Sequence, residues 1–254
     1  MQLNHKVYGQ GPALIILHGL FGSLDNWVSH ARQLSVDYTV FLVDQRNHGR
    51  SPHDPAFSYP VMAEDLHEFM AQQGIRQAHL LGHSMGGKTV MTFADRYPDQ
   101  VDKLIVADMA PKQYPPHHND VVAAMKSIDL ATLSSRQEAN ELMLPLIPEL
   151  GVRQFLLKSL GRDEVKNFRW KFNLPVLIET YPNIIADTPI GFPFEGPTLF
   201  VHGGNSHYLA ESDKPAIEEV FPHATFAKIP GAGHWLHAEK PAEFLKIVQG
   251  FLEG

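Results

Sequence analysis

The chain has no cysteine among its 254 residues. Disulfide bonds, thiolate metal sites and a cysteine nucleophile are therefore excluded. Charged residues make up only 19% of the chain and hydrophobic residues 44%, a balance that is typical of a folded protein and not of a disordered one. Because this length lies near the upper end of what one domain spans, we expect a single large hydrophobic core.

Long apolar runs and targeting signals are also absent. No stretch approaches the roughly 20 apolar residues that a membrane helix needs. Residues 1–10 show no basic segment followed by an apolar run, so we expect no secretory signal and predict a cytoplasmic protein. The formal net charge of −7 makes attraction to nucleic acid or to an anionic membrane unfavourable. We expect neither as a partner, and the oligomeric state stays open; the small-molecule partner that we predict follows from the motifs below.

What the sequence does contain is an alternation of short apolar runs with helical patterns. Residues 61–73 and 85–97 carry apolar side chains at helical spacing, between brief apolar runs. This alternation implies right-handed crossovers and a mostly parallel sheet with helices on both faces. The predicted strands are residues 13–17, 39–43, 78–81, 103–107, 198–202 and 224–229, and the later helices are residues 214–220 and 241–252.

A long interruption separates two of these strands. Residues 109–197 form an interval of 89 residues, whereas a crossover with its helix needs only about a dozen or somewhat more. We therefore predict an inserted, mainly helical lid at residues 111–194, over the carboxyl ends of the strands, and a core made of residues 1–110 and 195–254. Within the insertion, residues 121–133 and 136–146 have helical patterns and residues 167–172 alternate like a strand.

Residues 82–86 read Gly-His-Ser-Met-Gly, a G-x-S-x-G pentapeptide between a predicted strand and a predicted helix. In that context the serine stands on a sharp, strained turn that presents its Oγ above the sheet, and the glycines leave room for the turn. Ser84 is therefore the predicted nucleophile. The N–H of Met85 is a predicted donor of the oxyanion hole. The alternative is a tight turn with an incidental serine.

Two further glycine-rich turns follow predicted strands. In residues 18–22 (HGLFG) the N–H of Leu20 is the predicted second oxyanion donor, with that of Phe21 as the alternative, while His18 braces the loop. In residues 231–235 (GAGHW) His234 is the predicted general base, because the chain order serine, acid, histidine is the one this arrangement uses. His237 has no third ligand beside it, so we predict no metal site.

The acid that orients His234 is less obvious from the sequence. The loop after the strand at residues 198–202 carries no carboxylate, and the first acids beyond it are Glu211 and Asp213. Asp108 instead stands at the carboxyl end of the strand that follows the helix of Ser84. We therefore predict Asp108 as the acid. The alternative is an aspartate that only caps the start of the insertion.

Six segments spread over the whole chain are more specific than G-x-S-x-G alone. They are residues 18–26 (HGLFGSLDN), 44–51 (DQRNHGRS), 82–88 (GHSMGGK), 154–159 (QFLLKS), 203–206 (GGNS) and 231–240 (GAGHWLHAEK). In these segments the sequence resembles the YbfF-type esterases of bacteria and their mitochondrial relatives, within the α/β-hydrolase superfamily. The resemblance implies the α/β-hydrolase fold and hydrolysis of short- to medium-chain acyl esters without a cofactor. It also implies an acid at the position of Asp108 and a serine, here Ser206, where the acid more often stands.

Together these features predict a serine hydrolase that cleaves carboxylic esters through an acyl-enzyme on Ser84, with acyl thioesters as a second substrate class. We expect Ser206 to support the site by a hydrogen bond to Asp108 or His234. Haloalkane and epoxide hydrolysis are excluded, because they need an aspartate at position 84. Two alternatives stay open: a carbon–carbon bond hydrolase on the same fold, and a non-catalytic protein that keeps only the ligand pocket.

Charged residues elsewhere have simpler explanations. In residues 44–51 Arg46 and His48 look like catalytic residues in isolation, but we interpret both as shaping the loop after a strand, with Asp44 as a turn residue and Arg46 as a bracing donor. The middle of the insertion is basic, which could steer an anionic substrate such as an acyl-coenzyme A, although a solvated face explains the same charges. The basic residues are Arg153, Lys158, Arg162, Lys166, Arg169 and Lys171.

Overall fold

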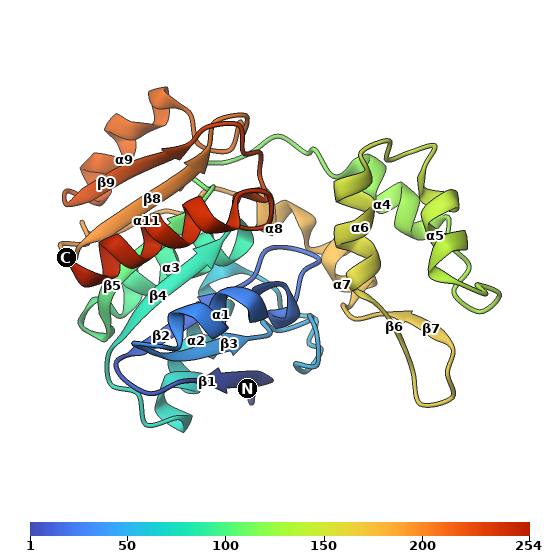
Figure 1. Cartoon of the computed structure of the whole chain (residues 1–254), viewed down its shortest axis with the longest axis horizontal. Coiled ribbons are helices and arrows are strands. Elements are labelled where there is room, and N and C mark those ends of the chain that lie inside the picture. The colour runs from blue at the N-terminus through green and yellow to red at the C-terminus, as the bar shows by residue number, and fades with distance from the viewer.

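A computed structural model describes residues 1–254 and is built around a seven-stranded sheet with the strand order β1-β3-β2-β4-β5-β8-β9 (Figure 1). Only β1 (His5–Tyr8) runs antiparallel to its neighbour β3, so the predicted mostly parallel sheet is confirmed. The parallel strands are β2 (Ala13–Leu17), β3 (Thr39–Val43), β4 (Ala78–His83), β5 (Val101–Ala107), β8 (Thr198–Gly203) and β9 (Ala224–Ile229).

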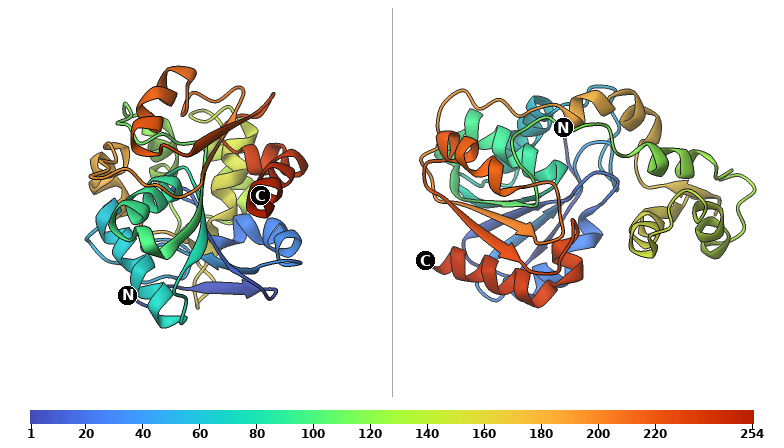
Figure 2. Two further views of the ribbon diagram at one scale, coloured as in Figure 1. Left: turned by 90° about the vertical axis from the view of Figure 1, so that its left-hand side faces the viewer. Right: turned by 90° about the horizontal axis from the view of Figure 1, so that it is seen from above.

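Helices cover both faces of the sheet, as Figure 2 shows from two further directions. Successive side chains of β2 point to opposite faces: Ile15 and Leu17 pack against one layer of helices and Leu14 and Ile16 against the other. The inner strands are largely apolar because both of their faces are buried, whereas the edge strands β1 and β9 are partly exposed. The first layer contains α2 (Tyr59–Gln72), α3 (Met85–Arg96) and α9 (Lys214–Val220), and the second α1 (Val28–Leu34) and α11 (Pro241–Glu253). No helix combines the length and the apolar character that crossing a bilayer requires.

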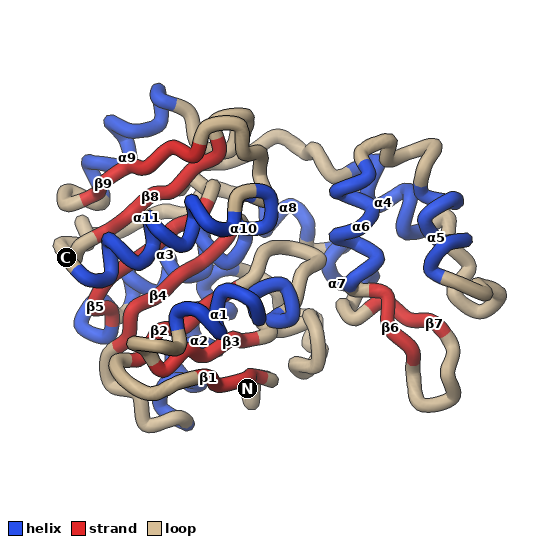
Figure 3. Tube along the Cα trace, viewed as in Figure 1, coloured by secondary structure: helices blue, strands red, loops and turns tan.

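Between β5 and β8 the chain leaves the sheet and forms a group of short elements that projects to one side (Figure 3). Its apolar side chains pack with Leu20, Phe21 and Met85 of the sheet region in one hydrophobic cluster. The insertion is thus built directly onto the loops that surround Ser84. Its elements are α4 (Asn119–Lys126), α5 (Arg136–Met143), α6 (Leu150–Lys158), the hairpin β6 (Leu160–Arg162) and β7 (Phe168–Trp170), α7 (Leu174–Glu179) and α8 (Tyr181–Ile185).

The helix boundaries inside the insertion differ from those predicted. The predicted helix at residues 121–133 ends at Lys126, because the Asp129 side chain accepts the N–H of Ala131 at 3.0 Å and turns the chain. Helix α5 ends at Met143, two residues before Pro145, rather than at residue 146. Several elements were not predicted, among them α1, α6, α7, α8 and the edge strand β1, whose half-exposed residues form no apolar run.

A buried lysine ties the two connecting segments of the insertion together. Lys88, one turn into α3, donates through Nζ to the carbonyl of Lys112 at 2.7 Å and also to that of Ala186. These carbonyls belong to the beginning and the end of the insertion. Burial lowers the pKa of Lys88 to about 8. The sequence segment 82–88 therefore links the turn at Ser84 to both ends of the inserted segment.

A buried ion pair holds the loop after β3 against α2. Arg46 donates to Asp65 through Nε at 2.5 Å and through Nη2 at 2.8 Å, and through Nη1 to the carbonyl of Ala56 at 2.6 Å. The side chains of Arg46 and Asp65 are only 7% and 5% exposed. Asp44 accepts N–H groups of Leu24 and Arg50. Arg46 thus braces the loop, as the sequence interpretation proposed, and Asp44, interpreted as a turn residue, holds the backbone of the same loop.

This ion pair gives the first prediction. Asp65→Ala removes the buried counter-charge of the Arg46 guanidinium and leaves only an exposed carboxylate near it, so we expect the free energy of unfolding to fall by about 3–5 kcal/mol. The matched control is Asp54→Ala, because Asp54 lies 3.6 Å from the same guanidinium but is 41% exposed. That control should cost less than about 1 kcal/mol. Urea unfolding of both variants measures the difference, and equal losses would show that burial does not determine the strength of this pair.

Candidate active site

Ser84 stands on the turn between β4 and α3 with φ 54° and ψ −118°. A positive φ is strained for a residue with a side chain and persists only where neighbours enforce it. Here the Ser84 N–H donates to the carbonyl of Ala107 at 3.0 Å, and the Ser84 carbonyl accepts the N–H of Lys88 at 3.2 Å. The strand ends directly before the serine and the helix begins directly after it, which is the context its motif requires.

The two glycines of the motif allow backbones to approach closely. A Cβ on Gly82 would lie 2.1 Å from the carbonyl oxygen of Gly86. A Cβ on Gly86 would lie 2.5 Å from the carbonyl oxygen of Leu17 and 2.7 Å from that of His18. No side chain fits at either position without moving the backbone. The absence of side chains therefore brings the start of α3 against the end of β2.

The structure brings Ser84, His234 and Asp108 into one hydrogen-bonded series. The Ser84 Oγ lies 3.0 Å from Nε2 of His234, and Nδ1 of His234 lies 2.7 Å from Oδ2 of Asp108. Because an ionised carboxylate only accepts, Nδ1 carries the proton and Nε2 is free to accept from the hydroxyl. Asp108 is fully buried directly after β5, with φ 52°, and its Oδ1 accepts the N–H of Gly203 at 3.0 Å.

Ser206 also lies in this series, as predicted from the resemblance. Its hydroxyl donates to Oδ2 of Asp108 and accepts the N–H of Tyr208 at 3.3 Å. The alternative acids bond elsewhere: Asp213 accepts from Lys112 at 2.6 Å, and Glu211 pairs with Lys214 at 2.7 Å.

Two aromatic residues that sequence reasoning missed hold His234 in place. Tyr208 stacks on its imidazole with ring centroids 3.7 Å apart and an interplanar angle of 15°. His83, the second residue of the G-x-S-x-G motif, donates through Nε2 to the His234 carbonyl at 2.8 Å. Burial lowers the pKa of His83 to about 3, so it acts here as a neutral donor. A position adjacent to Ser84 was the only sequence signal for His83.

The loop of residues 18–22 lies beside the start of α3, and the N–H of Leu20 is the predicted donor within it. The N–H of Leu20 has no hydrogen-bond partner in the protein. Met85 is the first residue of α3, where an N–H has no partner within the helix. The alternative donor is already engaged, because the N–H of Phe21 donates to Nε2 of His48 at 3.2 Å. Leu20 and Met85, not Phe21, are therefore the N–H groups available to an oxyanion.

Histidines brace this loop instead of reacting. Nδ1 of His18 lies 2.8 Å from the carbonyl of Gly19, and its Nε2 accepts the N–H of Gln45 at 3.1 Å. Burial lowers the pKa of His18, which favours the neutral form that can both donate and accept. His237 is also structural: its ring stacks on Trp27 at 4.3 Å.

A cavity of about 220 Å³ opens beside Ser84 and His234. One wall comes from the sheet region through Leu20, Phe21 and Trp235. The facing wall comes from the insertion and is mainly apolar. The residues that α4 and α6 contribute to it are Val121, Val152, Phe155 and Leu156.

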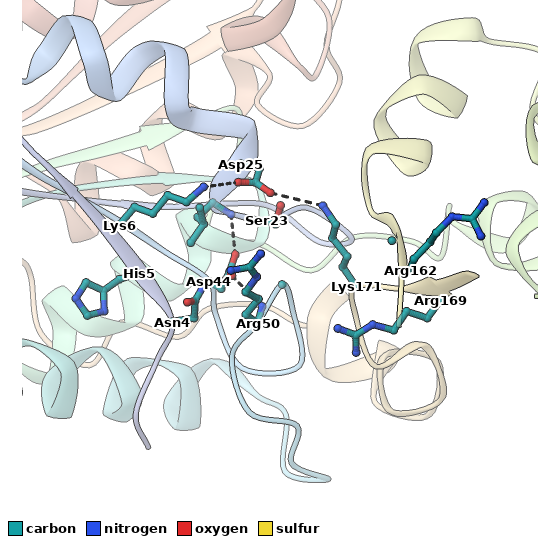
Figure 4. Close-up of a pocket in the computed structure, with 13 residues that line it drawn as sticks. Asn4, His5, Lys6, Ser23, Asp25, Asp44, Arg50, Arg162, Arg169 and Lys171 are labelled. Atoms are coloured by element: carbon teal, nitrogen blue, oxygen red, sulfur yellow. Dashed lines mark hydrogen bonds and ion pairs between the residues drawn. The ribbon is translucent and has the colours of Figure 1, made fainter. Parts of the chain in front are cut away.

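A second, polar cleft of about 290 Å³ lies between the sheet region and the hairpin β6–β7 (Figure 4). Asp25 bridges its two sides, with Lys6 at 2.8 Å and Lys171 of the insertion at 3.5 Å. It does not include Ser84 or His234. The larger of the two cavities is thus not the one at the hydrogen-bonded series.

Known proteins resemble this chain over most of its length. A family model described as the alpha/beta hydrolase fold matches residues 12–241. The esterase YbfF of Escherichia coli (strain K12) is 42% identical over 240 residues, which cover 94% of this chain and 92% of the esterase. The sn-1-specific diacylglycerol lipase ABHD11 of Mus musculus is 40% identical, with 95% of this chain and 81% of the lipase covered.

A solved structure described as a marine microorganism esterase superposes with a TM-score of 0.96. It shares 44% of its sequence with this chain, and the match covers 98% of this chain and 99% of the other. The resemblance to YbfF-type esterases stated from the motifs is therefore confirmed. The family model spans most of the chain, and the chain belongs to the α/β-hydrolase family.

Proposed function

We propose that this protein is a serine hydrolase that cleaves carboxylic esters, with Ser84 as the nucleophile. The observation that carries the proposal is the series from Ser84 Oγ through His234 to Asp108, with distances of 3.0 and 2.7 Å. Relatives named as esterases and lipases at 40–42% identity support an ester as the substrate. A protein that only bound a ligand would need the cavity but not this series.

In the proposed reaction, Nε2 of His234 takes the proton of Ser84 as Oγ attacks the ester carbonyl carbon. The carbonyl electron pair moves onto the oxygen, and the N–H groups of Leu20 and Met85 stabilise the resulting charge. Collapse of this intermediate expels the alcohol, which receives the proton from His234. Water then hydrolyses the acyl-enzyme by the same steps. Asp108 holds the imidazole in the required tautomer and stabilises its protonated form.

The cavity beside Ser84 supports an acyl group of short to medium length. Its volume is about 220 Å³, and more than half of its lining residues are hydrophobic. We propose that residues 111–194 act as a lid on a core of residues 1–110 and 195–254, because α4 and α6 form one wall of this cavity. A chain-length series of nitrophenyl esters would define the preferred acyl group. Turnover of carbon–carbon substrates alone would favour the alternative hydrolase.

The nucleophile gives the second prediction. Ser84→Ala removes the attacking oxygen and should lower kcat for nitrophenyl esters by about 10⁴-fold or more, leaving the catalysis that the oxyanion donors and binding supply. A fluorophosphonate probe should add to the wild-type protein at Ser84, which mass spectrometry of the labelled peptide would show. Ser206→Ala is the control and should still be labelled. Near-normal turnover by Ser84→Ala would end the proposal.

The third prediction ranks the acids. Asp108→Asn should lower kcat by up to about 10⁴-fold, because an amide at this position favours the wrong tautomer of His234. Ser206→Ala removes only an uncharged donor to Asp108 and should have a much smaller effect. Asp213→Asn, a matched substitution on a carboxylate that bonds Lys112, should remain near normal. If Asp213→Asn were severely impaired and Asp108→Asn active, the orienting acid would be Asp213.

A thioester with an anionic leaving group is a second candidate substrate, and the polar cleft favours it. Three of the six basic residues proposed to steer such a substrate make contacts within the protein. Arg153 is buried and donates to carbonyl groups of its own insertion, and Lys171 pairs with Asp25. The cleft nevertheless has exposed arginines on both sides, with Arg50 on the sheet region and Arg169 on the hairpin (Figure 4). The Arg162 side chain turns away from Arg50 and donates to the carbonyl of Lys166 at 2.5 Å.

Ionic strength provides the fourth prediction. If these cations attract the substrate, kcat/KM for an acyl-coenzyme A should fall as salt rises, because ions screen charges beyond about 10 Å at 0.1 M. Hydrolysis of an uncharged nitrophenyl ester should change little. Arg169→Ala should flatten the salt dependence for the thioester alone. A thioester rate that is independent of salt in the wild type would show that the cleft does not steer.

A further inference from the structure

Phe21, in the loop that carries the free N–H of Leu20, is held at both of its backbone polar groups by side chains from distant segments. Its N–H donates to Nε2 of His48 at 3.2 Å. Its carbonyl accepts the hydroxyl of Ser159 at 2.7 Å, a contact between residues 138 positions apart. Phe21 has φ 61°, so its backbone needs such enforcement to persist.

The two side chains come from different parts of the molecule. His48 belongs to the loop after β3, is fully buried and donates through Nδ1 to the carbonyl of Arg46 at 3.0 Å. Burial lowers the pKa of His48 to about 3, so its Nε2 keeps the lone pair that accepts from Phe21. Ser159 belongs to the insertion, directly after α6, and is 1% exposed. Phe21 is thus the residue through which the insertion forms a hydrogen bond with the loop of residues 18–22.

The ring of Phe21 makes the same connection. It lies 5.2 Å from the ring of Phe172 and 6.0 Å from that of His118, both in the insertion. The segment around Ser159 is itself fixed, because the Ser159 carbonyl accepts the N–H of Lys171 at 2.8 Å. Across the boundary, Asn173 donates its N–H to the carbonyl of Asn47 at 2.8 Å. The Ser159 hydroxyl that bonds Phe21 therefore belongs to a segment that backbone hydrogen bonds hold in place.

The position of Phe21 bears directly on the oxyanion donor. The N–H of Leu20 shares a planar peptide unit with the carbonyl of Gly19, which points to the opposite side. That carbonyl accepts from Nδ1 of His18 at 2.8 Å and from the N–H of Gly22 at 3.1 Å. The next peptide unit contains the N–H of Phe21, which donates to His48, and the unit after it contains the carbonyl of Phe21, which accepts from Ser159. The direction of the Leu20 N–H is thus determined on one side by His18 and on the other by His48 and Ser159.

We propose that Ser159 is a positioning residue for ester hydrolysis: by holding the Phe21 carbonyl it aims the Leu20 N–H at the oxyanion. This inference rests on the proposed function and extends it to the insertion. Helix α6, which ends directly before Ser159, also carries Phe155 and Leu156 of the cavity wall. One helix therefore contacts the acyl group and sets the oxyanion loop. Hydrolysis depends on the insertion being seated as it is here.

Substitution of Ser159 tests the proposal through steady-state kinetics. Ser159→Ala removes the donor without adding bulk and should lower kcat for a nitrophenyl ester by about 10- to 100-fold, since misplacement of one donor has effects of this order. KM should change by less than about threefold, because the oxyanion forms only in the transition state. Ser159→Cys keeps the size but donates weakly, so its kcat should lie between those of the wild type and Ser159→Ala.

A transition-state analogue separates positioning from a merely structural role. A trifluoromethyl ketone forms a tetrahedral adduct on a serine and places an oxyanion where the ester would. Its affinity should fall in Ser159→Ala by the same factor as kcat/KM. The control is Ser127→Ala, which removes a hydroxyl of the same insertion that donates to Ala124 at 2.8 Å and does not contact Phe21. That variant should match the wild type in kcat and in analogue affinity.

The outcomes are distinguishable. If the wild type neither hydrolyses esters nor is labelled at Ser84, the proposed function fails and this inference with it. If the wild type is active and Ser159→Ala retains its kcat, only the positioning role is wrong. A lower kcat with unchanged analogue affinity would also overturn it, because the oxyanion donor would then be intact. If Ser159→Ala does not fold, the same comparison is made with Ser159→Cys, and wild-type kcat in that variant would count against the proposal.

Discussion

The approach of Gly86 to the end of β2 is the contact on which the rest of the site depends. Because position 86 carries no side chain, the first turn of α3 lies against the carbonyl oxygens of Leu17 and His18, at distances that any Cβ would forbid. This contact brings the N–H of Met85 and the loop of Leu20 to the same side of Ser84. Glycine at position 86 is therefore needed for the contact between α3 and the end of β2, as well as for the turn that holds the serine.

The second half of the site is assembled by the order of the strands. Strand β5 lies between β4 and β8, so the residue after β5 can face both the serine and the loops beyond β8. Asp108 occupies this place, with φ 52°, its N–H on the carbonyl of Val201 and its carboxylate on Gly203, Ser206 and His234. A carboxylate here is held by backbone and side chain from the neighbouring strand. The loop after β8 consequently needs only a hydroxyl where an acid would otherwise stand.

This division explains what could be predicted from the sequence. Ser84 and His234 stand in short motifs whose meaning is local, and Asp108 follows from counting strands, so chain order alone placed them. Tyr208 and Ser159 act through contacts with distant segments. Ser159 ends the segment 154–159 that the resemblance rests on, but nothing local in that segment shows its contact with Phe21. Arg153 shows the converse limit: a count of basic residues placed it on a charged face, yet it is buried and donates to Asn140, Ile147 and Pro148.

Two neutral histidines hold the loop of Leu20 in one position, although Phe21 in that loop has a strained backbone. A neutral imidazole offers one donor and one acceptor on opposite sides of a rigid ring, so it can join two backbone groups that face away from each other. His18 links Gly19 to Gln45, and His48 links Phe21 to Arg46. Burial lowers the pKa of both, which preserves the acceptor. These two bridges are made within the sheet region, whereas the carbonyl of Phe21 accepts from the insertion, through the hydroxyl of Ser159.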